Sequence, residues 1–101
     1  MEDWRDRTQM LIGEKAVNRL AHSAVAVFGL GGVGSFAAEA LARAGVGRLV
    51  LVDGDTVSLT NLNRQLVALH STLGQSKAQV MAQRVQDINP DCRVEAHTAY
   101  Y

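Results

Sequence analysis

Short apolar runs alternate with stretches of helical spacing along this chain. Residues 24–28 (AVAVF) form a continuous apolar run rich in β-branched residues, which predicts a strand covered on both faces of a sheet. Leu49 to Val52 repeats this pattern and predicts a second buried strand. We expect a third strand over Arg93 to Ala96.

Two longer stretches between these runs are predicted to be helices. Residues 33–44 are helix formers, and Glu39 and Arg43 are spaced four apart, so they are expected to pair on the solvent side. Ser76 is expected to begin the second helix, with Gln79 placed to complete a capping box. The predicted inner stripe of that helix is Ala78, Met81, Ala82, Val85 and Ile88.

Two further segments complete the pattern. Residues 5–22 predict short helical pieces with a break at Gly13. Residues 53–75 form a long polar connection that contains one apolar patch, residues 66–69. Loops of this length in an α/β unit are usually functional or disordered. Within this connection, Asp55 is expected only to cap the following turn.

This order of elements predicts an α/β fold, a Rossmann-like doubly wound parallel sheet truncated after about three strands. Three parallel strands leave an unpaired edge where the next strand belongs. We therefore expect residues 1–101 to be the N-terminal part of one longer domain. Residues 1–22 would form a helical N-terminal arm, and residues 23–101 a βαβαβ half.

Composition and charge exclude several kinds of binding site and membrane segment. Ten basic and ten acidic residues give a formal net charge of zero, so a nucleic acid would have to meet a local basic patch. The single cysteine, Cys92, excludes an internal disulfide and is expected to be a small buried residue. The three histidines show no metal-ligand spacing. The charged start is not a signal peptide and no apolar run approaches membrane-spanning length, which predicts a cytoplasmic protein without membrane contact.

The sequence GLGGVG fits the pattern G-x-G-x-x-G, with Gly29, Gly31 and Gly34 in its three positions and Gly32 as an extra glycine. It follows a predicted strand and opens a predicted helix, the context in which such a loop binds phosphate groups at a helix N-terminus. Asp53 lies nineteen residues after Gly34, where a carboxylate can accept hydrogen bonds from ribose hydroxyls. These features fit NAD and ATP equally well.

The segment TNLNRQ and Lys77 favour ATP consumption. Transfer of an adenylyl group builds up charge on a phosphate and on departing pyrophosphate. Arg64 offers a planar fork and Lys77 a point charge for such groups, and Asn61 can donate an amide hydrogen. An NAD-binding dehydrogenase or regulatory module is the alternative from another class, but it leaves Arg64 and Lys77 without a role.

Several motifs together carry a family resemblance. RTQMLIGEKAV, GLGGVGS, LVLVDGDTVSLTNLNRQ, and Lys77 after LGQS occur in order. From Arg7 to about Cys92 the chain resembles the adenylation domain of the ubiquitin-activating-enzyme superfamily, which includes bacterial adenylyltransferases of thiamine and molybdopterin synthesis. Residues 68–92 are most similar to the tRNA threonylcarbamoyladenosine dehydratases within that superfamily.

The resemblance implies that residues 1–101 are the N-terminal part of one ATP-binding adenylation domain, with residues 23–101 as its βαβαβ nucleotide-binding half. It also implies roles for particular residues. The glycine loop would approach the phosphates of ATP and Asp53 would hold the ribose, while Asn61, Arg64 and Lys77 would reach the phosphate chain. Arg7 falls on an arginine that reaches into the partner subunit's site, which implies a homodimer. The nucleotide-binding set is Gly29, Gly31, Gly32, Gly34, Asp53, Asn61, Arg64 and Lys77, and the catalytic set is Arg64, Lys77 and Arg7. No metal ligand is assigned, because the superfamily's Mg²⁺-binding aspartate is expected beyond Tyr101.

The implied activity is ATP-dependent adenylation of the carboxylate of threonylcarbamoyladenosine in tRNA, followed by cyclisation with net loss of water. The nearest alternative is adenylation of the C-terminal glycine of a ubiquitin-like sulfur-carrier protein, because both reactions would use the same ATP site. The 101 residues alone are not expected to be a competent enzyme.

Overall fold

Three parallel strands form one sheet in the computed structural model, which describes residues 3–101. The strands are β1 (Ala24–Phe28), β2 (Arg48–Val52) and β3 (Arg93–His97), in the order β1-β2-β3. They are aligned so that Phe28, Val52 and His97 are register partners at the carboxyl end. The carboxyl ends of all three strands therefore share one edge of the sheet.

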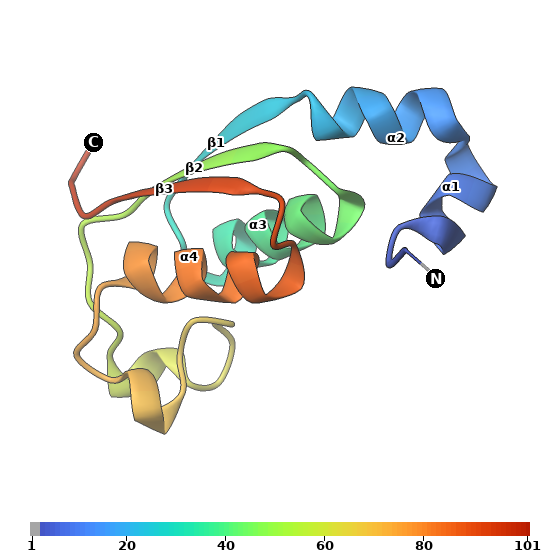
Figure 1. The fold of residues 1–101 in the computed structure, drawn as a ribbon. Helices are drawn as coiled ribbons and strands as arrows, with labels where there is room; N and C mark the ends of the chain where they lie inside the picture. Colours follow the sequence, from blue (N-terminus) through green and yellow to red (C-terminus); the bar gives the residue numbers. More distant parts are fainter. Residues whose placement is uncertain (1–2) are drawn as a thin grey trace.

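Both crossover helices, α3 (Gly32–Ala44) and α4 (Lys77–Ile88), lie on the same face of the sheet (Figure 1). The two crossovers step in the same direction across the sheet, and crossovers of one hand then place both helices on one side. The expectation that β1 is covered on both faces is therefore wrong for the described residues. Ala24, Ala26 and Phe28 point to the other face and are exposed.

Two short helices precede the sheet. They are α1 (Asp6–Ile12) and α2 (Glu14–Ala21), which meet at Gly13 as expected. In Figure 1 they lie beyond the amino end of β1, away from the carboxyl edge of the sheet. Of these two helices, only Val17 is buried.

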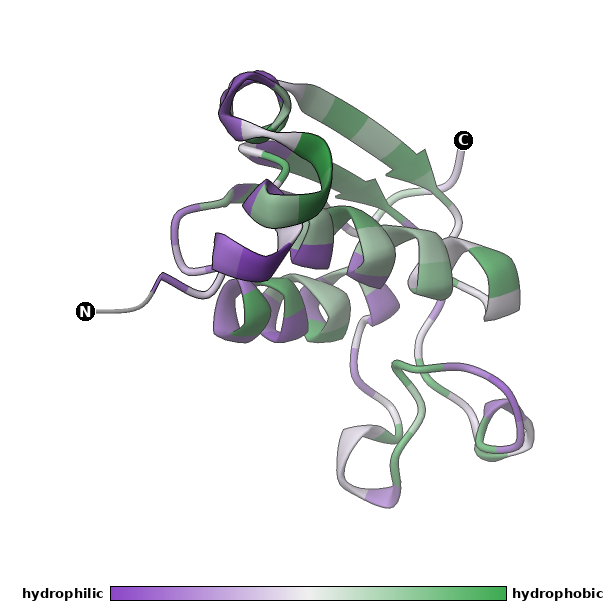
Figure 2. Cartoon of the chain, turned by 90° about the vertical axis from the view of Figure 1, so that its right-hand side faces the viewer, coloured by the Kyte–Doolittle hydropathy of each residue, from purple (hydrophilic) through white to green (hydrophobic). Residues whose placement is uncertain are grey.

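The long connection between β2 and α4 is an ordered loop with two short 3₁₀ turns, η1 (Leu59–Asn61) and η2 (His70–Thr72). In Figure 2 this loop lies below the helices, and apolar stretches alternate with polar ones along it. Val57, Val67 and Ala68 from this loop are buried in the core. Thr56 and Ser76 form an antiparallel bridge, so the two ends of the connection lie side by side.

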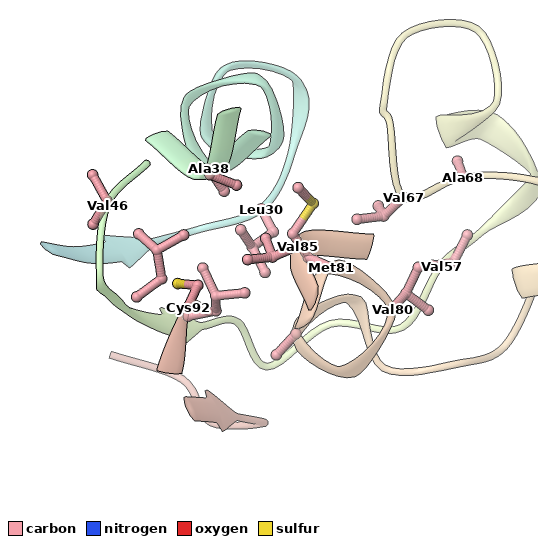
Figure 3. Packing of buried hydrophobic residues seen from close by; sticks show 14 residues of the cluster. Leu30, Ala38, Val46, Val57, Val67, Ala68, Val80, Met81, Val85 and Cys92 are labelled. Atoms are coloured by element: carbon pink, nitrogen blue, oxygen red, sulfur yellow. The ribbon is translucent and has the colours of Figure 1, made fainter. Parts of the chain in front are cut away.

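The core lies between the sheet and the two helices (Figure 3). Ala38 and Ala42 on α3 are fully buried, and these small side chains allow the helix to approach the sheet closely. The other fully buried apolar side chains include Leu30, Leu49, Leu51, Ala78, Met81, Val67 and Val85. Cys92 joins this cluster as expected, and its burial raises the pKa of the thiol.

The predicted inner stripe of α4 is confirmed, but the stripe is wider than expected. Ala78, Met81 and Val85 are buried, and Ala82 and Ile88 pack against the cluster. Val80 is also buried, because the connecting loop supplies a second apolar surface beside α4. The Ser76 hydroxyl accepts a hydrogen bond from the Gln79 N–H at 3.4 Å, which is the capping half of the expected box.

Polar contacts fasten the two helices to each other. The Asn89 side-chain Nδ2 donates to the backbone oxygens of Ala42 and Val46 at 3.2 and 3.1 Å. Glu39 does pair with Arg43, but it also pairs with Arg84 of α4. The expectation that Glu39 lies on the solvent side is therefore wrong. Its carboxylate bridges α3 and α4, and the Arg84 hydrogen bond is the main reason that the pKa of Glu39 is lowered.

Candidate nucleotide-binding site

The glycine loop makes a tight connection between β1 and α3. Gly29 has a φ of +88°, a left-handed conformation that favours glycine. A Cβ at Gly34 would lie 1.7 Å from the Gly29 carbonyl oxygen, so only glycine lets the helix pack this closely on the loop. Among residues 3–101, no side chain caps the N-terminus of α3 at Gly31. Its first N–H groups are consequently available to an anion.

Asp53 lies at the carboxyl end of β2 and is buried, with 6% of its surface exposed. Its Oδ2 accepts a hydrogen bond from the Leu30 N–H at 2.6 Å, and its Oδ1 accepts one from the Asp55 N–H at 2.7 Å. The carboxylate is therefore fixed directly beside the glycine loop. A carboxylate has about four acceptor positions, so lone pairs remain for two ribose hydroxyls.

Asn61 ends the η1 turn and is buried. Its Oδ1 accepts hydrogen bonds from both the backbone N–H and the hydroxyl of Ser58. These two bonds orient the carboxamide so that Nδ2 is its remaining hydrogen-bonding atom. Within the described part of the chain Nδ2 has no hydrogen-bond partner, which leaves two N–H groups for a ligand.

Arg64 is exposed and its guanidinium rests on its own loop. Nη1 donates to the Thr60 carbonyl oxygen at 3.1 Å and to Asn63 Oδ1 at 2.9 Å. No ion pair involves Arg64 among residues 3–101, so its positive charge is not neutralised there. Its Nε and Nη2 donors are the ones that remain for an incoming anion.

Lys77 is the most unusual residue of the site. It is the first residue of α4, and only 6% of its surface is exposed. Its backbone N–H donates to the Asp55 carbonyl oxygen at 3.1 Å, which fixes this helix end next to the carboxyl end of β2. Within residues 3–101 its ammonium has neither a hydrogen bond nor an ion pair. Buried lysines are normally paired, and an anionic ligand would supply the missing partner.

The structure does not bring Arg7 together with the other candidate residues. Arg7 lies on α1 and is exposed, and α1 lies beyond the opposite end of the sheet (Figure 1). Within one chain it has no access to the glycine loop.

Two residues of the site were not identified from the sequence. Ser58 holds Asn61, as described above, and Gln65 is buried next to the glycine loop. Gln65 Nε2 lies 3.6 Å from the point that a Cβ on Gly31 would occupy. TNLNRQ contains Gln65, but only the path of the loop shows that its side chain returns to Gly31.

Tyr100 and Tyr101 lie beside the carboxyl edge of the sheet. The Tyr100 ring lies 2.6 Å from the position of a Cβ on Gly54, and the Tyr101 hydroxyl lies 2.7 Å from that of a Cβ on Gly29. The Tyr100 hydroxyl donates to Asp55 Oδ1 at 3.2 Å. The expectation that Asp55 caps the following turn is wrong, since its side chain accepts from Tyr100 while η1 is capped by the interaction of Ser58 with Asn61.

Residues 3–101 contain neither a cluster of metal-ligating side chains nor a membrane-spanning helix. No three His, Cys, Asp or Glu side chains lie together as a possible metal site. No helix in this part of the chain is long and apolar enough to cross a bilayer.

Comparison with known proteins identifies the family. Residues 5–100 match the ThiF family. The chain belongs to this family. The chain is 57% identical over 95 residues to the tRNA threonylcarbamoyladenosine dehydratase of Bacillus subtilis, covering 94% of this chain and 37% of that protein. It is 46% identical over 80 residues to ubiquitin-like modifier-activating enzyme 5 of Arabidopsis thaliana, covering 79% of this chain and 18% of that protein.

Solved structures of a relative match the fold of this ThiF family chain. Those of the Escherichia coli tRNA N6-threonylcarbamoyladenosine dehydratase, TcdA, in complex with ATP and with AMP, each give a TM-score of 0.92 at 48% identity. The match covers 99% of this chain and 42% of the E. coli chain. The Rossmann-like α/β fold expected from the sequence is thereby confirmed. The chain spans about two fifths of the length of these dehydratases.

Proposed function

We propose that residues 1–101 are the N-terminal part of one ATP-binding adenylation domain, and that this site binds ATP. The observation that carries the proposal is Lys77, a residue only 6% exposed whose ammonium has no partner in the described chain, at the edge that also holds the glycine loop and Asp53. Bound ATP would place phosphates against the N–H groups of α3 and its ribose against Asp53. The E. coli relative that binds ATP supports this assignment.

The proposed first step is attack by a substrate carboxylate oxygen on the α-phosphorus of Mg-ATP. A new P–O bond forms while the bond to pyrophosphate breaks, which gives an acyl-adenylate and free pyrophosphate. Arg64 and Lys77 would stabilise the charge that develops on the phosphates, and Asn61 Nδ2 would donate to a phosphate oxygen. These residues position the phosphates and neutralise their charge. Mg²⁺ enters as part of the substrate rather than as an ion held by residues 3–101.

The proposed carboxylate is the threonyl one of threonylcarbamoyladenosine in tRNA. The neighbouring carbamoyl nitrogen would attack the activated carbonyl, lose its proton and expel AMP, so that the RNA loses one water. The similarity to dehydratases with this named substrate supports the choice. A tRNA substrate would be met in the cytoplasm, which is the location we propose.

The similarity to a ubiquitin-like modifier-activating enzyme supports a second candidate substrate. In that case the carboxylate would belong to the C-terminal glycine of a ubiquitin-like sulfur-carrier protein. The identity to that enzyme is lower than to the Bacillus dehydratase, so we favour tRNA. A nicotinamide-binding module is not favoured, because the solved structures of the E. coli relative are complexes with ATP and with AMP.

We further propose a homodimer in which Arg7 acts in the partner's site. Its exposed position on α1, remote from its own glycine loop, supports this arrangement. The full-length protein should therefore sediment as a dimer, and Arg7→Ala should lower activity without weakening the fold. Mixing Arg7→Ala with an Arg64→Ala variant should restore part of the activity, because one of the two sites would be intact.

The decisive test combines the full-length protein, Mg-ATP and tRNA that carries threonylcarbamoyladenosine. Mass spectrometry of the released nucleoside should show an ATP-dependent loss of one water. Loss of pyrophosphate exchange in Arg64→Ala, with unchanged melting, would support the site assignment. An unchanged nucleoside in an enzyme active in pyrophosphate exchange would contradict the tRNA assignment and favour the carrier protein.

A further inference from the structure

Gln65 has a side-chain carboxamide that nothing in the described chain satisfies. The residue is 8% exposed, and its Oε1 is fully buried without a hydrogen-bond partner. No hydrogen bond of Nε2 to residues 3–101 is present either. Buried polar side chains are normally hydrogen-bonded. Oε1 can only accept, so the atom that can serve an anionic ligand at this edge is the unpartnered donor Nε2.

The backbone holds Gln65 firmly in this position. Its N–H donates to the Asn61 carbonyl oxygen at 3.0 Å, and its own carbonyl oxygen accepts from the Ala68 N–H at 3.0 Å. Ala68 is buried in the core. Gln65 is thus fixed between the η1 turn, which carries Asn61, and a buried apolar anchor.

The side chain borders the space above the second glycine of the loop. Its Nε2 and Cδ lie 3.6 and 4.0 Å from the position of a Cβ on Gly31, and no other group of the described chain, apart from neighbours in sequence, lies within 4 Å of that point. In a G-x-G-x-x-G loop the second glycine lacks a side chain so that a phosphate group can approach the backbone. The amide nitrogen of Gln65 is therefore at the rim of the space that a phosphate would enter.

We propose that Gln65 is a further phosphate-binding residue, whose Nε2 donates a hydrogen bond to a phosphate oxygen of a nucleotide lying over Gly31. This proposal rests on the proposed ATP-binding function. Lys77 and Arg64 would bring positive charge to the phosphates. Gln65 is neutral and would instead contribute one directional hydrogen bond. A neutral donor fixed at the glycine loop selects the position of the phosphate relative to the backbone.

Gln65→Met and Gln65→Glu in the full-length protein test the proposal. Methionine keeps the length and approximate volume of the side chain without a donor, and glutamate keeps the shape but places a carboxylate beside the phosphate. The affinities for ATP and for adenosine are measured by calorimetry, together with melting temperatures. Gln83→Glu is the matched control for the change in charge, because Gln83 is exposed on α4.

The expected result separates the two ligands. Gln65→Met should weaken ATP binding at least about tenfold and leave adenosine binding within about twofold, and Gln65→Glu should weaken ATP binding further. ATP affinity within about twofold of wild type in Gln65→Met would overturn the proposal. Equal losses for ATP and adenosine would also overturn it, because they would indicate a packing role. If Gln65→Met fails to fold, the same comparison is made with Gln65→Glu. Failure of wild type to bind ATP would instead reject the proposed function.

Discussion

Ser58 holds the side-chain oxygen of Asn61 through two hydrogen bonds, from its backbone N–H at 2.9 Å and from its hydroxyl at 3.0 Å. The carboxamide therefore presents its nitrogen to the proposed phosphate position. Asn61→Asp keeps both acceptor contacts but replaces the free donor by a carboxylate oxygen. We expect it to lower pyrophosphate exchange about 100-fold or more while melting as wild type.

Ser58→Ala tests the same contact with a milder change than Asn61→Asp. It removes the hydroxyl bond and keeps the backbone bond, so Asn61 is held less firmly. We expect a decrease of only a few-fold in kcat, with the KM for ATP nearly unchanged. A larger effect than in Asn61→Asp would show that Ser58 acts in another way than through Asn61.

Lys77→Met should separate stability from activity. The Lys77 ammonium makes no hydrogen bond or ion pair with residues 3–101, so its removal breaks no contact there and the melting temperature should stay about equal. Pyrophosphate exchange should nevertheless fall about 100-fold or more, because a positive charge on the phosphates is lost. Thermal melts with and without ATP test both parts, since ATP should stabilise wild type and not the variant. A variant that melts lower and still exchanges pyrophosphate would contradict the assigned role.

Gly34→Ala and Gly32→Ala form a matched pair of equal chemistry. A Cβ at Gly34 would meet the Gly29 carbonyl oxygen at 1.7 Å, whereas one at Gly32 would have nothing within 4 Å. Gly34→Ala should therefore lose several kcal/mol of stability, on the order of 3, or fail to fold. Gly32→Ala should fold normally and bind ATP less tightly, because the added methyl group occupies space at the phosphate-binding helix end. Urea unfolding and ATP titration give the two measurements.

Glu39 should make folding stability dependent on pH in the acid range. Hydrogen bonding to Arg84 lowers the pKa of Glu39 below its ordinary value of 4.5, so the carboxylate contributes stability above that pH. The contribution is lost as pH falls through the lower pKa of the folded state. Arg84 is partly exposed, so the pair should contribute only about 0.5–1 kcal/mol at neutral pH. Urea unfolding of wild type and Glu39→Gln should differ at pH 7 and converge as the pH falls through the lowered pKa of Glu39 in the folded state.

The strands and helices were predictable because each element's pattern depends on its own residues. The apolar run AVAVF predicted β1, and the helical spacing of apolar residues around Met81 predicted α4. The predictions that β1 is covered on both faces and that Glu39 lies on the solvent side were wrong. Both properties depend on which other element packs against the residue, which its own sequence pattern does not specify. The residue types of the site could be predicted, but the contact of Gln65 with Gly31 and the burial of Val80 depend on the folded path of residues 53–76.

The uncovered face of the sheet has a consequence for handling the 101-residue polypeptide. The face opposite the helices carries the apolar side chains of Phe28, Val50 and Val52. It adjoins the outer edge of β1, and that edge has no strand partner among residues 3–101. Unpaired strand edges with apolar side chains promote pairing between molecules. At high concentration this polypeptide should self-associate along β1, so its solubility should depend strongly on concentration even where each molecule is correctly folded.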